Sequence, residues 1–142
     1  MKTYLFSSIF LMLTLFSTTQ SQAQEIDNDK NNYVVLTKKV PQLQPIILTA
    51  EALKAEEGKA YGDFQVIICG KLIGDITDRE KMGDFIEKAK NAGVQINACG
   101  FSLNKFKVDT TKVPDEMKTV ENGILYNLQL QKKGYNLRFY HS

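Results

Sequence analysis

The segment from Phe64 to Cys69 reads Phe-Gln-Val-Ile-Ile-Cys, an almost unbroken apolar run. Such a run is typical of a strand covered on both faces, which is the usual situation of a strand in a parallel sheet. Residues 94–99 and the β-branched run at 33–37 predict two further strands. Helical patterns separate these runs, and strands that alternate with helices favour a parallel α/β sheet.

The clearest helical pattern covers residues 78–92. Thr77 and Glu80 have the spacing of a capping box at its start. One buried face is indicated by apolar residues at i, i+3, i+4 and i+7, namely Met82, Phe85, Ile86 and Ala89. Gly93 follows as a C-terminal stop. We therefore expect a single helix that packs this face against the sheet.

The remaining pattern completes the fold class. Further helices are predicted at 46–55 (behind Pro45), at 101–106 and from Asn122 to Gly134, with a weak strand at 117–120 and a last strand at 135–140 near a sheet edge. We expect one α/β domain over residues 33–142. It has a mostly parallel sheet of about five strands with helices on both faces, in a flavodoxin-like arrangement.

The N-terminus has the three parts of a secretory signal peptide. Lys2 precedes an uncharged apolar stretch at 4–16, and Ser21-Gln22-Ala23 ends the segment with small residues. We expect residues 1–23 to be removed and residues 24–32 to form a polar, disordered lead. The mature protein is then periplasmic or secreted. A lipid anchor is not indicated, because no cysteine lies in or just after the apolar stretch.

Charge and hydropathy exclude several classes of protein. The formal net charge of the chain is +2, and removal of residues 1–23 takes away only Lys2. Such a chain has no electrostatic reason to bind nucleic acid or anionic lipid. No segment after the signal peptide approaches the ~20 apolar residues of a transmembrane helix. We therefore expect neither a nucleic-acid partner nor a membrane association after cleavage.

The chain contains two cysteines, Cys69 and Cys99. They are too far apart in sequence for a Cys-x-x-Cys redox motif or a zinc knuckle. The single histidine, His141, makes a metal site of histidine and cysteine ligands improbable. Three interpretations remain: one disulfide, two buried inert thiols, or one reactive thiol.

Strand polarity places both thiols at the edge of the sheet where ligands bind in open α/β folds. Cys69 follows three apolar residues and is best interpreted as inert core. Cys99 follows Asn97 and Ala98 and precedes a short helix, whose N–H groups would favour the thiolate. In a sheet of order 2-1-3 the first strand would lie between the two cysteines, so we expect them to be too far apart for a disulfide.

The residues around Cys99 also resemble a known family. The segments Val-Gln-Ile-Asn-Ala-Cys-Gly-Phe-Ser-Leu (94–103), Val-Glu-Asn-Gly-Ile (120–124) and Leu-Gln-Leu-Gln-Lys-Lys-Gly-Tyr (128–135) are similar to the DsrE/DsrF-like family of sulfur-relay proteins. The resemblance implies a compact α/β fold that often assembles into trimers or hexamers. It also implies a persulfide on Cys99, binding roles for Gly100 and Ser102, no cofactor, and a protein that donates or accepts sulfur. The best known members work in the cytoplasm, whereas this chain is expected to be exported.

Two functions therefore compete. In the first, Cys99 is the persulfide acceptor of a sulfur carrier or transferase, and its thiolate attacks a sulfane sulfur. In the second, the protein is a non-catalytic binding or assembly module of the same fold. A carrier needs an exposed Cys99 of low pKa, whereas a module tolerates a buried one.

Overall fold

The computed structural model describes residues 29–139. Its strands are β1 (Asn31–Thr37), β2 (Tyr61–Ile68), β3 (Val94–Cys99), β4 (Lys118–Val120) and β5 (Asn136–Phe139). Its α-helices are α1 (Leu43–Glu57), α2 (Arg79–Met82), α3 (Phe85–Ala92), α4 (Gly100–Lys105) and α5 (Gly123–Lys132). Short 3-10 turns are η1 (Val40–Gln42), η2 (Gly58–Ala60), η3 (Ile73–Thr77) and η4 (Thr110–Lys112). The predicted signal peptide, and the predicted lead as far as residue 28, lie outside the described residues.

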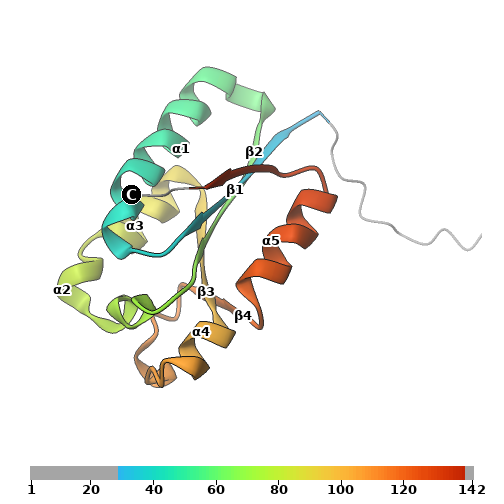
Figure 1. The fold of residues 1–142 in the computed structure, drawn as a ribbon. Helices are drawn as coiled ribbons and strands as arrows, with labels where there is room; N and C mark the ends of the chain where they lie inside the picture. The colour runs from blue at the N-terminus through green and yellow to red at the C-terminus, as the bar shows by residue number, and fades with distance from the viewer. Residues whose placement is uncertain (1–28, 140–142) are drawn as a thin grey trace, which may run out of the picture.

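The five strands form one sheet of order β4-β3-β2-β1-β5 in which every neighbouring pair is parallel. The predicted α/β class and parallel sheet are confirmed, and β5 lies at an edge as predicted. The expected order, with the first strand between the second and third, is wrong. The chain adds β2, β3 and β4 successively on one side of β1, and only the crossover through α5 returns to the other side (Figure 1).

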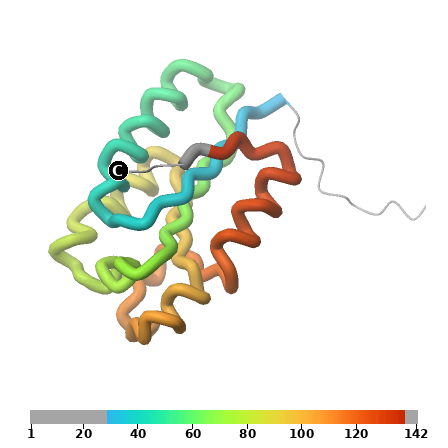
Figure 2. Tube along the Cα trace, viewed as in Figure 1, coloured from blue at the N-terminus to red at the C-terminus, as the bar shows by residue number. Residues whose placement is uncertain are grey.

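Helices cover both faces of this sheet, as the tube in Figure 2 shows: α5 stands on one side, and α1 and α3 stand on the other. Alternate residues of β2 pack into different clusters. Val66 and Ile68 join the core that includes Ile46 of α1, whereas Ile67 packs with Leu130 of α5. Burial on both faces explains why the last three residues of β2, Val66 to Ile68, are all apolar.

The helix predicted over residues 78–92 is two helices, because the chain turns at Gly83. Gly83 has φ +49° and ends α2, and α3 begins at Phe85. Positive φ is strained for residues with a side chain and suits glycine. The predicted face is otherwise turned inward: Met82 and Ala89 are buried, and Phe85 and Ile86 pack against the core while partly exposed.

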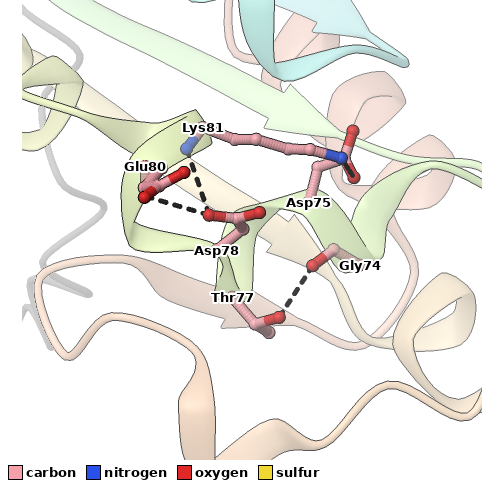
Figure 3. A network of polar contacts seen from close by, with 6 residues as sticks. All are labelled: Gly74, Asp75, Thr77, Asp78, Glu80 and Lys81. Atoms are coloured by element: carbon pink, nitrogen blue, oxygen red, sulfur yellow. Dashed lines mark hydrogen bonds and ion pairs between the residues drawn. The ribbon is translucent and has the colours of Figure 1, made fainter.

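The N-cap of α2 is Asp78, so the predicted capping box of Thr77 and Glu80 is wrong. Asp78 Oδ1 accepts hydrogen bonds from the backbone N–H groups of Glu80 (2.9 Å) and Lys81 (3.2 Å) (Figure 3). The hydroxyl of Thr77 is engaged elsewhere, because it donates to the carbonyl of Gly74 within η3 at 2.8 Å. A carboxylate at this position also interacts favourably with the helix dipole.

Three other predicted helix boundaries agree with the structure. Gly58 follows α1, Gly93 ends α3 in the left-handed conformation with φ +71°, and Asn122 caps α5. β1 begins at Asn31, two positions earlier than predicted. Among the helices of residues 29–139, none has the length and apolar character needed to cross a membrane.

Candidate functional site

The site lies at the carboxyl ends of β2 and β3. These strands are paired up to Ile68 and Ala98, so Cys69 and Cys99 come next on two neighbouring parallel strands. Cys69 still extends the ladder on its other side, where its N–H donates to the carbonyl of Thr37 at 3.0 Å. The expectation that β1 separates the two cysteines is wrong, because β2 lies between β1 and β3.

Both thiols meet the first residue of α5. A Cβ atom built on Gly123 would lie 2.5 Å from Sγ of Cys69 and 3.1 Å from Cβ of Cys99. Only a glycine leaves room for this approach. The two cysteines are free thiols, and together with the N-terminal end of α5 they form what we call the thiol pair site.

Burial of the two cysteines is opposite to expectation. Cys99 is only 3% exposed, whereas Cys69, which we expected to be inert core, is partly exposed. The α4 helix begins directly after Cys99, and the first residue of α5 contacts the Cys99 sulfur. The N-terminal ends of two helices therefore cover the end of β3. Cys69 leads instead into the less covered turn at Gly70 and Lys71.

The environment of Cys99 favours its thiolate. Burial by itself would raise the pKa of Cys99, but hydrogen bonds outweigh burial and the pKa is lowered from its ordinary value. The donors are the Ser102 hydroxyl, the backbone N–H groups of Gly123 and Ser102, and the Cys69 thiol. The Gly123 nitrogen lies 3.3 Å from Sγ of Cys99. A low thiol pKa close to helix N-terminal N–H groups is characteristic of reactive cysteines.

The environment of Cys69 has the opposite effect. Burial, the charge of the neighbouring Cys99 and the hydrogen bond between the two thiols raise the pKa of Cys69 to about 12. The pair therefore consists of one thiol held protonated and one inclined to ionise, with the first donating its hydrogen bond to the second.

Ser102 and Gly100, for which we predict binding roles, both lie next to the thiol pair site. Ser102 is buried, and its Oγ accepts a hydrogen bond from the N–H of Gly70 at 2.9 Å. Ser102 also donates a hydrogen bond to Cys99, so this one side chain connects the turn after Cys69 to Cys99. At Gly100 an added Cβ would lie 3.0 Å from the carbonyl oxygen of Val120, so glycine permits α4 to start against the end of β4.

A buried amide holds the two strands in register beneath the thiols. Asn97 is fully buried, and its Nδ2 donates to Oε1 of Gln65 at 2.8 Å and to the carbonyl of Val66 at 3.1 Å. A buried N–H donor without an acceptor is costly, and Nδ2 of Asn97 finds these acceptors on β2 only in this alignment, so the contacts favour one register of β2 and β3. That register places Cys69 beside Cys99.

Two contributors were missed by the sequence interpretation. The three apolar residues before Cys69 favour inert core, and the expected strand order separates it from Cys99, so the sequence does not indicate its place beside Cys99. Gly123 acts through its backbone N–H, and its signal is indirect: Asn122-Gly123 follows a short strand and begins a helix. Asn122 fixes this helix start, since its Oδ1 accepts from the N–H groups of Ile124 (3.0 Å) and Leu125 (3.2 Å).

The acidic side chains around α2 have structural partners. Asp78 caps α2, Asp75 pairs with Lys81 at 2.7 Å, and Asp84 pairs with Lys88 at 2.9 Å. Within residues 29–139, no three histidine, cysteine, aspartate or glutamate side chains are grouped so that they could hold a metal ion.

Comparison with known proteins identifies the fold and no family. No family model matches the chain, and neither does any curated protein. Among the solved structures similar to this chain are two described as proteins of unknown function. MTH1491 from Methanobacterium thermoautotrophicum has a TM-score of 0.63 and 15% identity, over 78% of this chain and 98% of that one. BT1422 from Bacteroides thetaiotaomicron has a TM-score of 0.59 and 16% identity, over 80% and 96%. At these identities the similarity establishes a shared fold.

Proposed function

We propose that this protein is a DsrE-like, thiol-based sulfur carrier or transferase that uses Cys99. The observation that carries the proposal is the position of Cys99 Sγ at the start of α5, 3.3 Å from the Gly123 nitrogen and hydrogen-bonded by the Ser102 hydroxyl, contacts that lower the pKa of Cys99. The resemblance of residues 94–103 and 128–135 to sulfur-relay proteins supports the same chemistry. Gly100 and Ser102 shape and polarise the site.

The reaction begins with attack of the Cys99 thiolate on a sulfane sulfur of the donor. A new S–S bond forms at Cys99 Sγ, the S–S bond of the donor breaks, and the shortened donor leaves with the electron pair. Cys99 then carries a persulfide, whose outer sulfur passes to the thiol of an acceptor protein by a second exchange. Because Cys99 is 3% exposed, a small donor such as inorganic polysulfide suits the site, and transfer to a protein thiol requires the cover over Cys99 to open.

The signal-peptide pattern of residues 1–23 supports a periplasmic or secreted location for this chemistry. We also propose that the protein forms homo-oligomers. Ile124, Leu125 and Leu128 of α5 are 60%, 52% and 50% exposed, an unusual amount of apolar surface for one short helix. Light scattering should give a mass above that of the monomer, and a monomer mass throughout the micromolar range would contradict this assembly.

A non-catalytic binding or assembly module is the second candidate. Burial of Cys99 favours it, because a carrier thiol must reach its partners, and so does the exposed apolar face of α5. The two functions differ in what happens at Cys99 rather than in the fold.

Inorganic polysulfide distinguishes the two candidates. Cys69→Ser and Cys99→Ser proteins are treated anaerobically, freed of excess reagent and examined by intact mass. A carrier predicts that Cys69→Ser gains sulfur, that a reducing agent removes it, and that Cys99→Ser gains none. Absence of an adduct on Cys69→Ser, or an equal adduct on both variants, would contradict the carrier and favour the module.

A further inference from the structure

The position of Cys69 is not explained by a carrier that needs only one thiol. Cys69 and Cys99 follow paired residues of adjacent parallel strands, whose separation of about 4.8 Å lies within the range of Cα distances that a disulfide can bridge. Both side chains are on the α5 side of the sheet, as the close approach of Gly123 to each of them shows. The hydrogen bond between the two thiols places their sulfur atoms next to each other.

The two thiols are also chemically unequal. Cys99 receives the hydrogen bonds from Ser102 and Gly123, whereas Cys69 lies outside that set and donates its own proton toward Cys99. Cys69 is in addition the more exposed of the two. This arrangement is suited to a first thiol that accepts sulfur and to a second thiol that gives its proton to the departing sulfur as it attacks.

We propose that Cys69 is a resolving thiol, which attacks the Cys99 persulfide, closes a Cys69–Cys99 disulfide and releases the carried sulfur as hydrogen sulfide. This inference rests on the proposed function, since it needs a persulfide on Cys99. The protein would then reduce sulfane sulfur, rather than only passing it to an acceptor.

The step is balanced. A bond forms between Sγ of Cys69 and Sγ of Cys99, and the bond between Sγ of Cys99 and its outer sulfur breaks. The outer sulfur of the hydropersulfide leaves with that electron pair and keeps its own hydrogen. It also takes the proton that Cys69 gives up, and so it is released as hydrogen sulfide. The sulfane sulfur is reduced and the two thiols are oxidised. A dithiol reductant returns the disulfide to two thiols and is oxidised to its own disulfide.

Ser102 and Gly123 favour this step by position. Ser102 holds Gly70, the residue after Cys69, at 2.9 Å and also contacts Cys99, so it restrains both partners of the exchange. Gly123 leaves the space beside both sulfur atoms free of a side chain. Held thiols react far faster than thiols that must meet by diffusion, because the entropy of encounter has already been lost.

A time course after brief polysulfide loading tests the proposal. Wild type, Cys69→Ser and Cys99→Ser are loaded anaerobically with inorganic polysulfide, desalted and sampled for intact mass and released sulfide. We expect wild type to lose the added sulfur, release one hydrogen sulfide per chain and end two hydrogen atoms lighter than the reduced protein. The adduct on Cys69→Ser should persist about tenfold longer or more. Trypsin should recover residues 60–71 linked to residues 91–105 from wild type alone.

The outcomes separate the two proposals. If Cys69→Ser acquires no sulfur, the carrier proposal fails. If Cys69→Ser and wild type acquire sulfur and keep it equally long, the carrier stands and the resolving role of Cys69 is overturned. Cys69→Ala serves as a second variant, with circular dichroism as a check of folding. Should neither variant fold, the linked peptides and sulfide release of wild type decide the question, and their absence would refute the proposal.

Discussion

Substitution of Gly123 by alanine should destabilise the protein, because this residue begins α5 in direct contact with the thiol pair site. The added methyl group would lie 2.5 Å from Cys69 Sγ, 2.8 Å from Ile67 Cγ2 and 3.1 Å from Cys99 Cβ. Ile67 and Cys99 are almost fully buried, so neither can move far to relieve the overlap.

Two effects of opposite sign set the magnitude. Overpacking of a well-filled core costs about 1–3 kcal/mol. Alanine in place of glycine in a helix returns at most about 1 kcal/mol. The steric cost is larger, and we expect the free energy of unfolding to fall by about 1–2 kcal/mol. For a domain of this size, Tm should fall by roughly 4–8 °C.

Denaturant and thermal unfolding measure this change, with Gly74→Ala as the matched control. At Gly74 an added methyl group would lie 3.7 Å from Val108, an ordinary contact, so stability should change by less than about 0.5 kcal/mol. In a Cys69→Ala background the 2.5 Å overlap is gone, and Gly123→Ala should cost less than in wild type. A Gly123→Ala protein as stable as wild type, or an equal cost in both backgrounds, would refute the packing of α5 on the two cysteines.

Three further predictions concern the same site and the N-terminus. Ser102→Ala leaves the Gly70 N–H without its acceptor and removes a hydrogen bond from Cys99. We expect a loss of about 1–3 kcal/mol in unfolding titrations and a higher Cys99 pKa; unchanged values of both would count against this role. Cys99→Ser removes the charge that opposes ionisation of Cys69, so the pKa of Cys69 should fall from about 12 and its alkylation at fixed pH should accelerate. Slower alkylation would contradict the coupling. Protein purified from the compartment outside the cytoplasm should begin at or near Gln24, and an intact Met1 would exclude cleavage.

Sequence patterns predicted which segments form strands and helices better than they predicted which strands lie next to each other. The carboxyl-terminal half of β2 is apolar because it is buried on both faces, whereas β3 alternates apolar residues with Gln95 and Asn97. Neither pattern depends on which strands are neighbours, so the sequence could not reveal that β2 and β3 are adjacent. The proximity of Cys69 to Cys99 follows from that adjacency, and it was therefore missed. The α2–α3 break was missed for a related reason: apolar spacing continues from Met82 to Ala89 although Gly83 interrupts the backbone.

The candidate site was predictable where chemistry resides in side chains. Cys99, Gly100 and Ser102 form one short segment, and strand polarity places its start at the end of the sheet. The Gly123 N–H was not predictable in this way, since every residue except proline has the same donor. The sequence shows a capping residue, Asn122, followed by a glycine. Only the packed structure shows that this helix start contacts Cys99.

The pH dependence of alkylation at each cysteine tests the central claim most directly. A small neutral reagent is applied to the native protein, and modification is quantified separately in tryptic peptides 91–105 and 60–71. Burial slows the absolute rate at Cys99, but the midpoint of its pH profile reports its own pKa. The account predicts a Cys99 midpoint below that of an ordinary cysteine and a Cys69 midpoint well above it. A Cys99 midpoint at or above the ordinary value would contradict the claim that this site holds an activated thiol.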